Sequence, residues 1–203
     1  EDPVTGDARF CGTTASMCGV EKAGFEGDAE GMKAAMKRDE MLHAFMLFLS
    51  GIPVLYSGDE IGQVNDYTYK DDPDKAPDSR YIHRGAFHWE LTRKIGEPGT
   101  VQQIIFSALS RLEQARAEEP AFDAGAAFRA LETGDDGVLG LERQLEKQQI
   151  RGFFNFSGED KRIFLEPGTR WANLLTGEEL EGENLLENHG FYWLKLLQRG
   201  EKQ

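Results

Sequence analysis

The sequence is short of basic residues and of long apolar runs, and each shortage excludes a class of protein. Its 203 residues include 36 acidic against 23 basic side chains, which gives a formal net charge of −13. Without a basic stripe to displace counterions, a nucleic-acid partner is disfavoured and a neutral ligand fits better. The longest apolar run, Ala44 to Leu49, is far shorter than the ~18 residues of a membrane-spanning helix, so we expect no membrane span.

Cysteine is also scarce, with Cys11 and Cys18 alone. Two cysteines are too few for a disulfide-stapled secreted fold, and without Cys-x-x-Cys spacing or histidine partners they form no zinc signature. We therefore predict free thiols in a cytoplasmic protein without metal or cofactor; the alternative is two small buried residues whose only role is packing. Residues 1 to 7 lack both an initiator methionine and a signal-peptide pattern, so we expect the chain to be an internal piece of a longer protein.

Apolar residues make up 39% of the chain, enough for the core of one large or two small domains. Apolar side chains recur at helical spacing from Asp28, a plausible N-cap, to Gly51, which predicts a long and largely buried helix. Its four methionines could form a soft binding surface, but filling gaps in a helical core is the simpler interpretation. A second helix is predicted from a Thr100 cap to Arg116.

Between these helices, Ile52 to Tyr56 form a continuous apolar run of strand length that ends at Ser57 and Gly58. A segment that is apolar on both faces suits a parallel strand covered on both sides. Polar groups at the carboxyl end of such a strand commonly form the site of an α/β barrel. The stretch after it, to residue 90, has no helical period but is rich in aspartate and aromatic residues, so we predict a folded site loop.

The pattern changes after Pro120. Short runs of β type, separated by turns rich in glycine and aspartate, predict an antiparallel β-sandwich. The expected strands are residues 127–131, 138–145, 150–156, 162–165, 171–175 and 191–197.

The loop contains candidate chemistry that spacing alone leaves undecided. Its carboxylates could bind calcium or act as acid and base, but no EF-hand spacing is present and most are expected to be solvated. Arg80 and Arg84 could orient a carboxylate in a site, or could form surface ion pairs of little consequence. The aromatic residues of the loop could stack on sugar rings or simply fill a core. No Ser-His-Asp pattern and no phosphate-binding glycine loop is evident.

Residues 51–62, GIPVLYSGDEIG, followed by NDY and DSRYIHR, resemble the last barrel strand and following loop of glycoside hydrolase family 13, the α-amylase family. The similarity is greatest to the amylosucrase and sucrose-hydrolase branch. Residues 3–9 and 11–15 are similar to the stretch that this branch places after its seventh strand. The resemblance implies the terminal βα units of a TIM barrel over residues 1–119 and a C-terminal β-sandwich domain over residues 120–203.

The resemblance also implies a retaining mechanism on sucrose or an α-glucan, by glucosyl transfer or hydrolysis. The family's catalytic carboxylates lie upstream of the matched part, so we expect no catalytic residue in this chain and no activity by itself. Arg84 and Trp89 are similar to an Arg-Thr-Pro-Met-Gln-Trp segment whose arginine pairs with an aspartate at subsite −1, although Gly85 and Ala86 depart from it. Arg84 is thus the first candidate for substrate binding. The further candidates, which would line the acceptor side, are Asp66, Tyr67, Asp78 and Arg80.

Two further expectations concern partners. The missing N-terminal part of the barrel is the expected partner of the chain, and without it the strand predicted at residues 52–56 would have an unpaired edge that favours self-association. The alternative to an enzyme fragment is a stand-alone carbohydrate-binding or interaction module.

Overall fold

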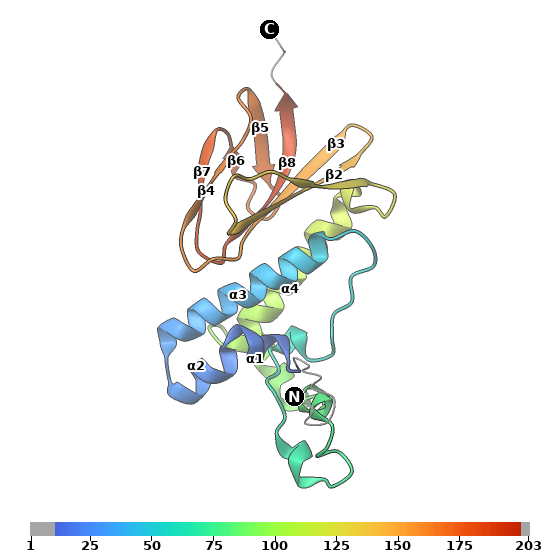
Figure 1. Ribbon diagram of the computed structural model, residues 1–203, viewed down its shortest axis with the longest axis vertical. Coiled ribbons are helices and arrows are strands. Elements are labelled where there is room, and N and C mark those ends of the chain that lie inside the picture. Colours follow the sequence, from blue (N-terminus) through green and yellow to red (C-terminus); the bar gives the residue numbers. More distant parts are fainter. Residues whose placement is uncertain (1–10, 200–203) are drawn as a thin grey trace. The chain divides into compact units, whose positions relative to one another are not determined.

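The computed structural model describes residues 11–199 (Figure 1). The chain divides into two compact units, Glu1–Asp39 with Leu55–Phe106, and Glu40–Val54 with Ser107–Gln203. We call them unit 1 and unit 2. Because each unit combines two separate stretches of chain, the units describe packing, and the domain boundary between residues 119 and 120 stays a prediction. The motif at residues 3–9 lies outside the described residues.

Unit 1 is mainly helical. It contains α1 (Thr14–Cys18), α2 (Val20–Glu26) and the first turns of α3 (Ala29–Phe48) and of α4 (Val101–Glu118). Thr13 caps α1 by accepting a hydrogen bond from the Ser16 amide, 3.2 Å away, and Gly19, at φ 100°, ends α1 in the left-handed conformation that favours glycine. The core of the unit is small, formed by Ala15, Val20 and Ala35.

Both long helices begin where the sequence predicts. The Asp28 carboxylate accepts a hydrogen bond from the Gly31 amide at 2.9 Å, and the Thr100 hydroxyl accepts one from the Gln103 amide at 3.2 Å. Such side-chain acceptors satisfy amide groups that the first turn of a helix leaves unpaired. Of the four methionines, Met41 is fully buried in a hydrophobic core, in keeping with the packing interpretation.

The prediction of a strand at residues 52–56 is wrong. The segment is irregular, and Ile52 and Val54 are 91% and 78% exposed. A strand requires a neighbour with which to exchange backbone hydrogen bonds, and all the strand pairs of the described residues are antiparallel and lie between residues 127 and 199. The apolar run therefore has no partner strand here, and the barrel units remain an expectation from the resemblance.

The segment after it is a loop, as predicted, without α-helix or strand up to residue 100. Short 3₁₀ turns give it structure. These turns are η1 (Asp59–Ile61), η2 (Thr68–Asp71), η3 (Ser79–His83) and η4 (Trp89–Gly96).

Unit 2 is built on antiparallel sheets, as predicted for the part of the chain after Pro120 (Figure 1). A six-stranded sheet has the order β1-β2-β3-β8-β5-β6, and β4 pairs with β7 in a second sheet. The six predicted strands are present, whereas the short β6 and β7 were not predicted. Their bounds are β1 (Ala127–Leu131), β2 (Val138–Leu145), β3 (Gln148–Asn155), β4 (Lys161–Phe164), β5 (Thr169–Asn173), β6 (Glu179–Leu180), β7 (Glu183–Leu186) and β8 (Phe191–Arg199).

Side chains alternate between the two faces of each strand, so the main sheet has apolar side chains on both faces. Both faces are covered. On one face, Phe154 and Trp193 pack with Phe48 of α3 and Phe122 of η5 (Pro120–Phe122). On the other, apolar residues of the main sheet pack with β4 and β7 in a second core, whose members are Val138, Phe153, Ile163, Leu165, Trp171, Leu180, Leu186 and Leu194.

Two arginine side chains cap the C-terminal end of α3. The Arg116 guanidinium donates to the carbonyl oxygens of Leu47 and Gly51, and the fully buried Arg143 donates to that of Phe48 at 3.2 Å. The last carbonyls of a helix have no partner within it and carry partial negative charge, so cationic donors are favourable there.

Candidate functional site

Two polar side chains hold the loop of unit 1 in place. Gln63 is 6% exposed; its amide nitrogen donates to the Ala86 carbonyl at 3.1 Å, and its amide oxygen accepts from the His88 backbone at 3.1 Å. A buried side chain with both ends bonded to backbone fixes two distant parts of the chain against each other. Gln63 therefore sets the position of the segment that follows Arg84.

Asn65 anchors the loop to α1 and α2 through hydrogen bonds. Its side-chain oxygen accepts from the Thr13 amide at 2.9 Å, its backbone amide donates to the Ser16 hydroxyl at 2.9 Å, and its side-chain nitrogen donates to the Glu21 carboxylate at 3.2 Å. The loop is thus anchored to the helices of its own unit, as a site loop must be if its side chains are to keep fixed positions.

Asp66, the first residue after this anchor, is oriented from several sides. Its backbone amide donates to the Ile82 carbonyl at 2.8 Å, and its carboxylate accepts from the Thr68 hydroxyl at 2.6 Å and the Thr68 amide at 2.9 Å. These two hydrogen bonds lower the pKa of Asp66, because they favour the charged form. Asp66 is therefore an ionised carboxylate with a set direction.

The Asp66 side chain packs directly against Gly85, in space that a larger residue would fill. A Cβ atom at residue 85 would lie 2.6 Å from the Asp66 carboxylate oxygen Oδ2 and 2.7 Å from the Asp66 Cβ. Any residue other than glycine at this position would therefore displace the Asp66 carboxylate.

Asp78 and Arg80 form one bidentate pair. The Asp78 carboxylate accepts from the Arg80 Nε at 2.8 Å and from Nη2 at 2.7 Å, and it also accepts from the Arg80 backbone amide. The hydrogen bonds from Arg80 lower the pKa of Asp78 to about 2. Both side chains are partly exposed, so the pair orients the start of η3 and contributes little to stability.

Arg84 lies close to that pair without joining it. Its charge adds to the lowering of the Asp78 pKa, its guanidinium carbon is 5.7 Å from the centre of the Tyr81 ring, and among residues 11–199 it makes no ion pair. An exposed guanidinium held against an aromatic ring keeps its donors available for a carboxylate.

Tyr67, the last of the predicted residues, is half exposed. The Lys70 ammonium is 5.5 Å from the centre of its ring, and its hydroxyl is 3.4 Å from the Asn65 side-chain nitrogen. The structure therefore brings Asp78, Arg80 and Arg84 together, and ties Asp66 and Tyr67 to the same loop through Asn65 and the backbone of η3.

Sequence reasoning missed Gln63 and the positioning roles of Asn65 and Gly85, because amides and glycines in a loop give no periodic signal. His83, which lies beside Arg84 in the sequence, was not among the predicted site residues. The ring of His83 lies 5.7 Å from that of Tyr56, and its Nδ1 is buried without a hydrogen-bond partner among the described residues. Asp59 and Glu60 serve their own turn, accepting from the amides of Tyr56 and Gly58.

No protein-family model matches the chain. A curated relative, the glucosylglycerate phosphorylase of Escherichia coli (strain K12), is 28% identical over 119 residues, which are 58% of this chain and 21% of that protein. The chain therefore spans about a fifth of the length of the relative it matches.

Two solved structures are similar to this chain over a larger share of its length than the curated relative is. AmyP in complex with maltose superposes with a TM-score of 0.65 at 17% identity, over 83% of this chain and 36% of that one. The trehalulose synthase MutB from Pseudomonas mesoacidophila MX-45 gives a TM-score of 0.62 at 17% identity, over 79% and 38%. The chain shares its fold with a part of each of these two proteins. At this identity the structural likeness concerns the fold alone. No described helix is long and apolar enough to cross a bilayer.

Proposed function

We propose that the chain is the C-terminal part of a retaining α-glucosyl enzyme of the α-amylase family that acts on sucrose or an α-glucan, by transfer or hydrolysis. The observation that carries the proposal is the sequence match to a glucosylglycerate phosphorylase over 119 residues. The placement in the amylosucrase and sucrose-hydrolase branch rests on the NDY and DSRYIHR motifs of the loop. The fold shared with AmyP and the trehalulose synthase supports only the broader proposal of an α-amylase-family enzyme.

In this proposal Arg84 acts as the anchor of the sugar site. Its guanidinium pairs with an upstream aspartate that holds the glucosyl unit at subsite −1, since a planar fork of donors fixes the direction of a carboxylate as well as its charge. The contact with Tyr81 and the absence of an ion pair within residues 11–199 support this role.

Asp66, Tyr67, Asp78 and Arg80 line the acceptor side. Asp66 and Asp78 are ionised at neutral pH because their pKa values are lowered, so both accept hydrogen bonds from sugar hydroxyls. The catalytic carboxylates belong to the upstream part of the enzyme, which is the partner of this chain. The 203 residues alone are therefore inactive in this proposal.

The test uses the protein in which this chain is joined to its upstream sequence. Arg84→Ala should lower kcat/KM for sucrose or maltotriose by about 100-fold, the usual effect of removing a group that positions the reacting centre. The matched control is Arg93→Ala, an exposed arginine in η4 of the same loop, which should change kcat/KM by less than about twofold. Equal activities of the two variants would refute the role of Arg84.

Assays of the 203-residue chain alone distinguish an enzyme fragment from a stand-alone binding module. Incubated with sucrose or maltotriose, it should release no fructose or glucose above a blank, and turnover would show that it holds catalytic residues of its own. Millimolar binding of maltooligosaccharides to the loop of unit 1, without turnover, would instead favour a stand-alone carbohydrate-binding module. Self-association through the exposed Ile52 and Val54 remains part of the proposal, and light scattering would detect it.

A further inference from the structure

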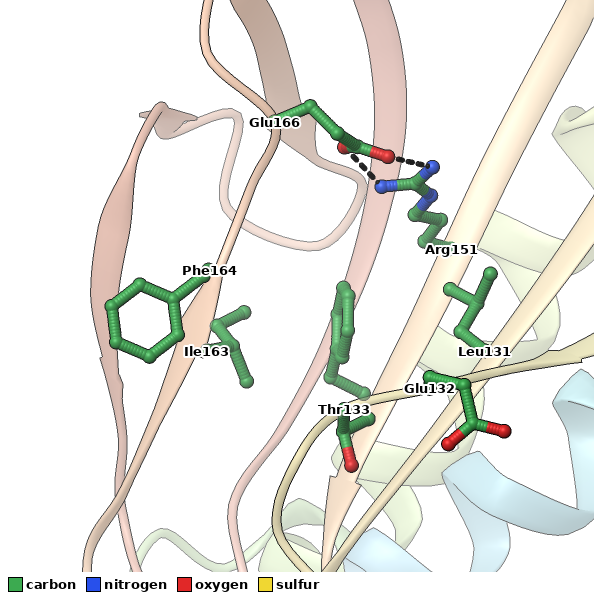
Figure 2. A pocket seen from close by; sticks show the side chains of 8 residues that line it. Leu131, Glu132, Thr133, Arg151, Ile163, Phe164 and Glu166 are labelled. Carbon is green, nitrogen blue, oxygen red and sulfur yellow. Dashed lines mark hydrogen bonds and ion pairs between the residues drawn. The ribbon is translucent and has the colours of Figure 1, made fainter.

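Unit 2 contains a pocket that has no part in the loop of unit 1. It has a volume of about 270 Å³ and lies between the end of β1, the middle of β3 and the end of β4 (Figure 2). Figure 2 shows Leu131 and Arg151 on one side and Ile163 on the other, with Thr133 at one end. Its size is close to the lower limit of small-molecule sites, so it suits a ligand of about one ring.

The fold creates this space between the two sheets. Gly140 of β2 faces Leu131 and Thr133, and a Cβ atom at residue 140 would lie 3.0 Å from the Leu131 Cβ and 2.8 Å from the Thr133 Cγ2. Phe153 and Ile163, which belong to the second core, supply apolar walls. The pocket is therefore a product of packed strands and does not depend on a loose loop.

Arg151 is the polar centre of the pocket. Its guanidinium is held by Glu142 at 2.9 Å and by Glu166 at 2.6 Å, and it lies 4.5 Å from the centre of the Trp171 ring. Three of its N–H groups serve the two carboxylates, so two of the five that an arginine carries remain. A guanidinium so fixed is a rigid donor, and its side chain is only 9% exposed.

The charges around the pocket oppose an anion. Glu132 and Glu166 of the lining are negative, and the charge of Arg151 is already paired with two carboxylates. A neutral ligand that both donates and accepts hydrogen bonds has donors in Arg151 and an acceptor in the Glu166 carboxylate, whereas the Thr133 hydroxyl is engaged with the backbone carbonyls of Asp135 and Val138. The apolar walls suit the C–H face of a ring.

We propose that this pocket binds a single unit of a neutral sugar, at a site separate from the loop of unit 1. The chemistry of unit 2 alone supports it, so it stands whether or not the proposed enzyme function is correct. A one-ring site of this kind should bind weakly, with a Kd of about 1 mM or above. Such a site would hold a saccharide chain near the enzyme without reacting with it.

The experiment is a titration of the isotope-labelled 203-residue chain with maltose, followed by backbone amide chemical shifts. Saturable shifts are expected at Thr133, Arg151 and Phe153. Leu131→Phe, which narrows the pocket, should weaken them at least tenfold. Leu185→Phe, at a half-exposed leucine of β7 outside the lining, should leave them unchanged.

Several other outcomes of the titration would overturn the proposal that the pocket binds a sugar. Absence of saturable shifts up to about 50 mM maltose, beyond the weak end of specific recognition, would overturn the proposal, as would equal effects of the two phenylalanine variants. Shifts confined to residues 63–88 would also overturn it, while leaving the proposed function of the loop intact. Inorganic phosphate and ethanolamine serve as anionic and cationic probes. Pocket shifts with phosphate in place of maltose would refute the argument from charge, and pocket shifts with ethanolamine in place of maltose would assign the pocket to a cation and overturn the proposal.

Discussion

Replacing Arg143 by methionine should destabilise unit 2 more than the loss of any surface arginine. Arg143 is fully buried, and its guanidinium donates to the carbonyl oxygens of Ala121 at 2.9 Å, Phe48 at 3.2 Å, Phe122 at 3.1 Å and Asp123 at 2.9 Å. Methionine has similar length and fills the space, but it donates no hydrogen bond. The substitution therefore tests the donors rather than the volume.

The magnitude follows from the carbonyl groups left behind. A buried polar group without a partner costs about 1 to 3 kcal/mol. The Asp123 carbonyl still accepts from the Ala126 amide at 3.0 Å, so three carbonyls lose their donor, which at the low end costs about 3 kcal/mol. Part of this is recovered because methionine avoids the desolvation of a buried cation. We expect a net loss of about 2 kcal/mol, which at an m-value of about 2 kcal/mol/M lowers the urea midpoint by about 1 M.

The assay is urea unfolding followed by tryptophan fluorescence, to which the buried Trp171 and Trp193 of the same unit contribute. The matched control is Arg170→Met on β5, where the side chain is 51% exposed and faces Glu179 at 3.3 Å; its cost should stay below about 0.5 kcal/mol. Arg143→Lys keeps the charge without the planar fork and should fall between the two. A cost for Arg143→Met no larger than that of the control would refute the reasoning.

Two further predictions concern titration. Burial by itself raises the pKa of Glu142, but hydrogen bonds from Arg129 and Arg151 outweigh it and lower the pKa in the fold; the resulting stability is present above the unfolded value of about 4.3 and is lost as the pH falls through the folded pKa. Urea midpoints measured from pH 6 to pH 3 should fall less steeply for Glu142→Gln than for the parent protein, and parallel curves would contradict this. Burial also raises the pKa of the Cys18 thiol to about 12, so a thiol reagent at pH 8 should label the half-exposed Cys11 alone. Cys11→Ser should then abolish labelling of the folded protein, whereas rapid modification of that variant would count against the burial of Cys18.

Local sequence determined those elements whose signal is carried by neighbouring residues. The helices beginning at Asp28 and Thr100 were predictable because a capping side chain and a helical period lie within the same stretch. The β runs were predictable from Ala127 onward because alternation and turn residues repeat at short spacing. The prediction of Arg84 as a binding residue likewise rests on a local motif, the spacing of Arg84 and Trp89.

Tertiary structure alone decided the rest, because the deciding contacts join residues far apart in the chain. The apolar run at residues 52–56 forms no strand, since a strand depends on a neighbour that its own sequence does not encode. The position of Asp66 depends on Gly85, and the end of α3 depends on Arg143, nearly a hundred residues away. The pocket around Arg151 exists only where separate strands face one another, so no local pattern could predict it.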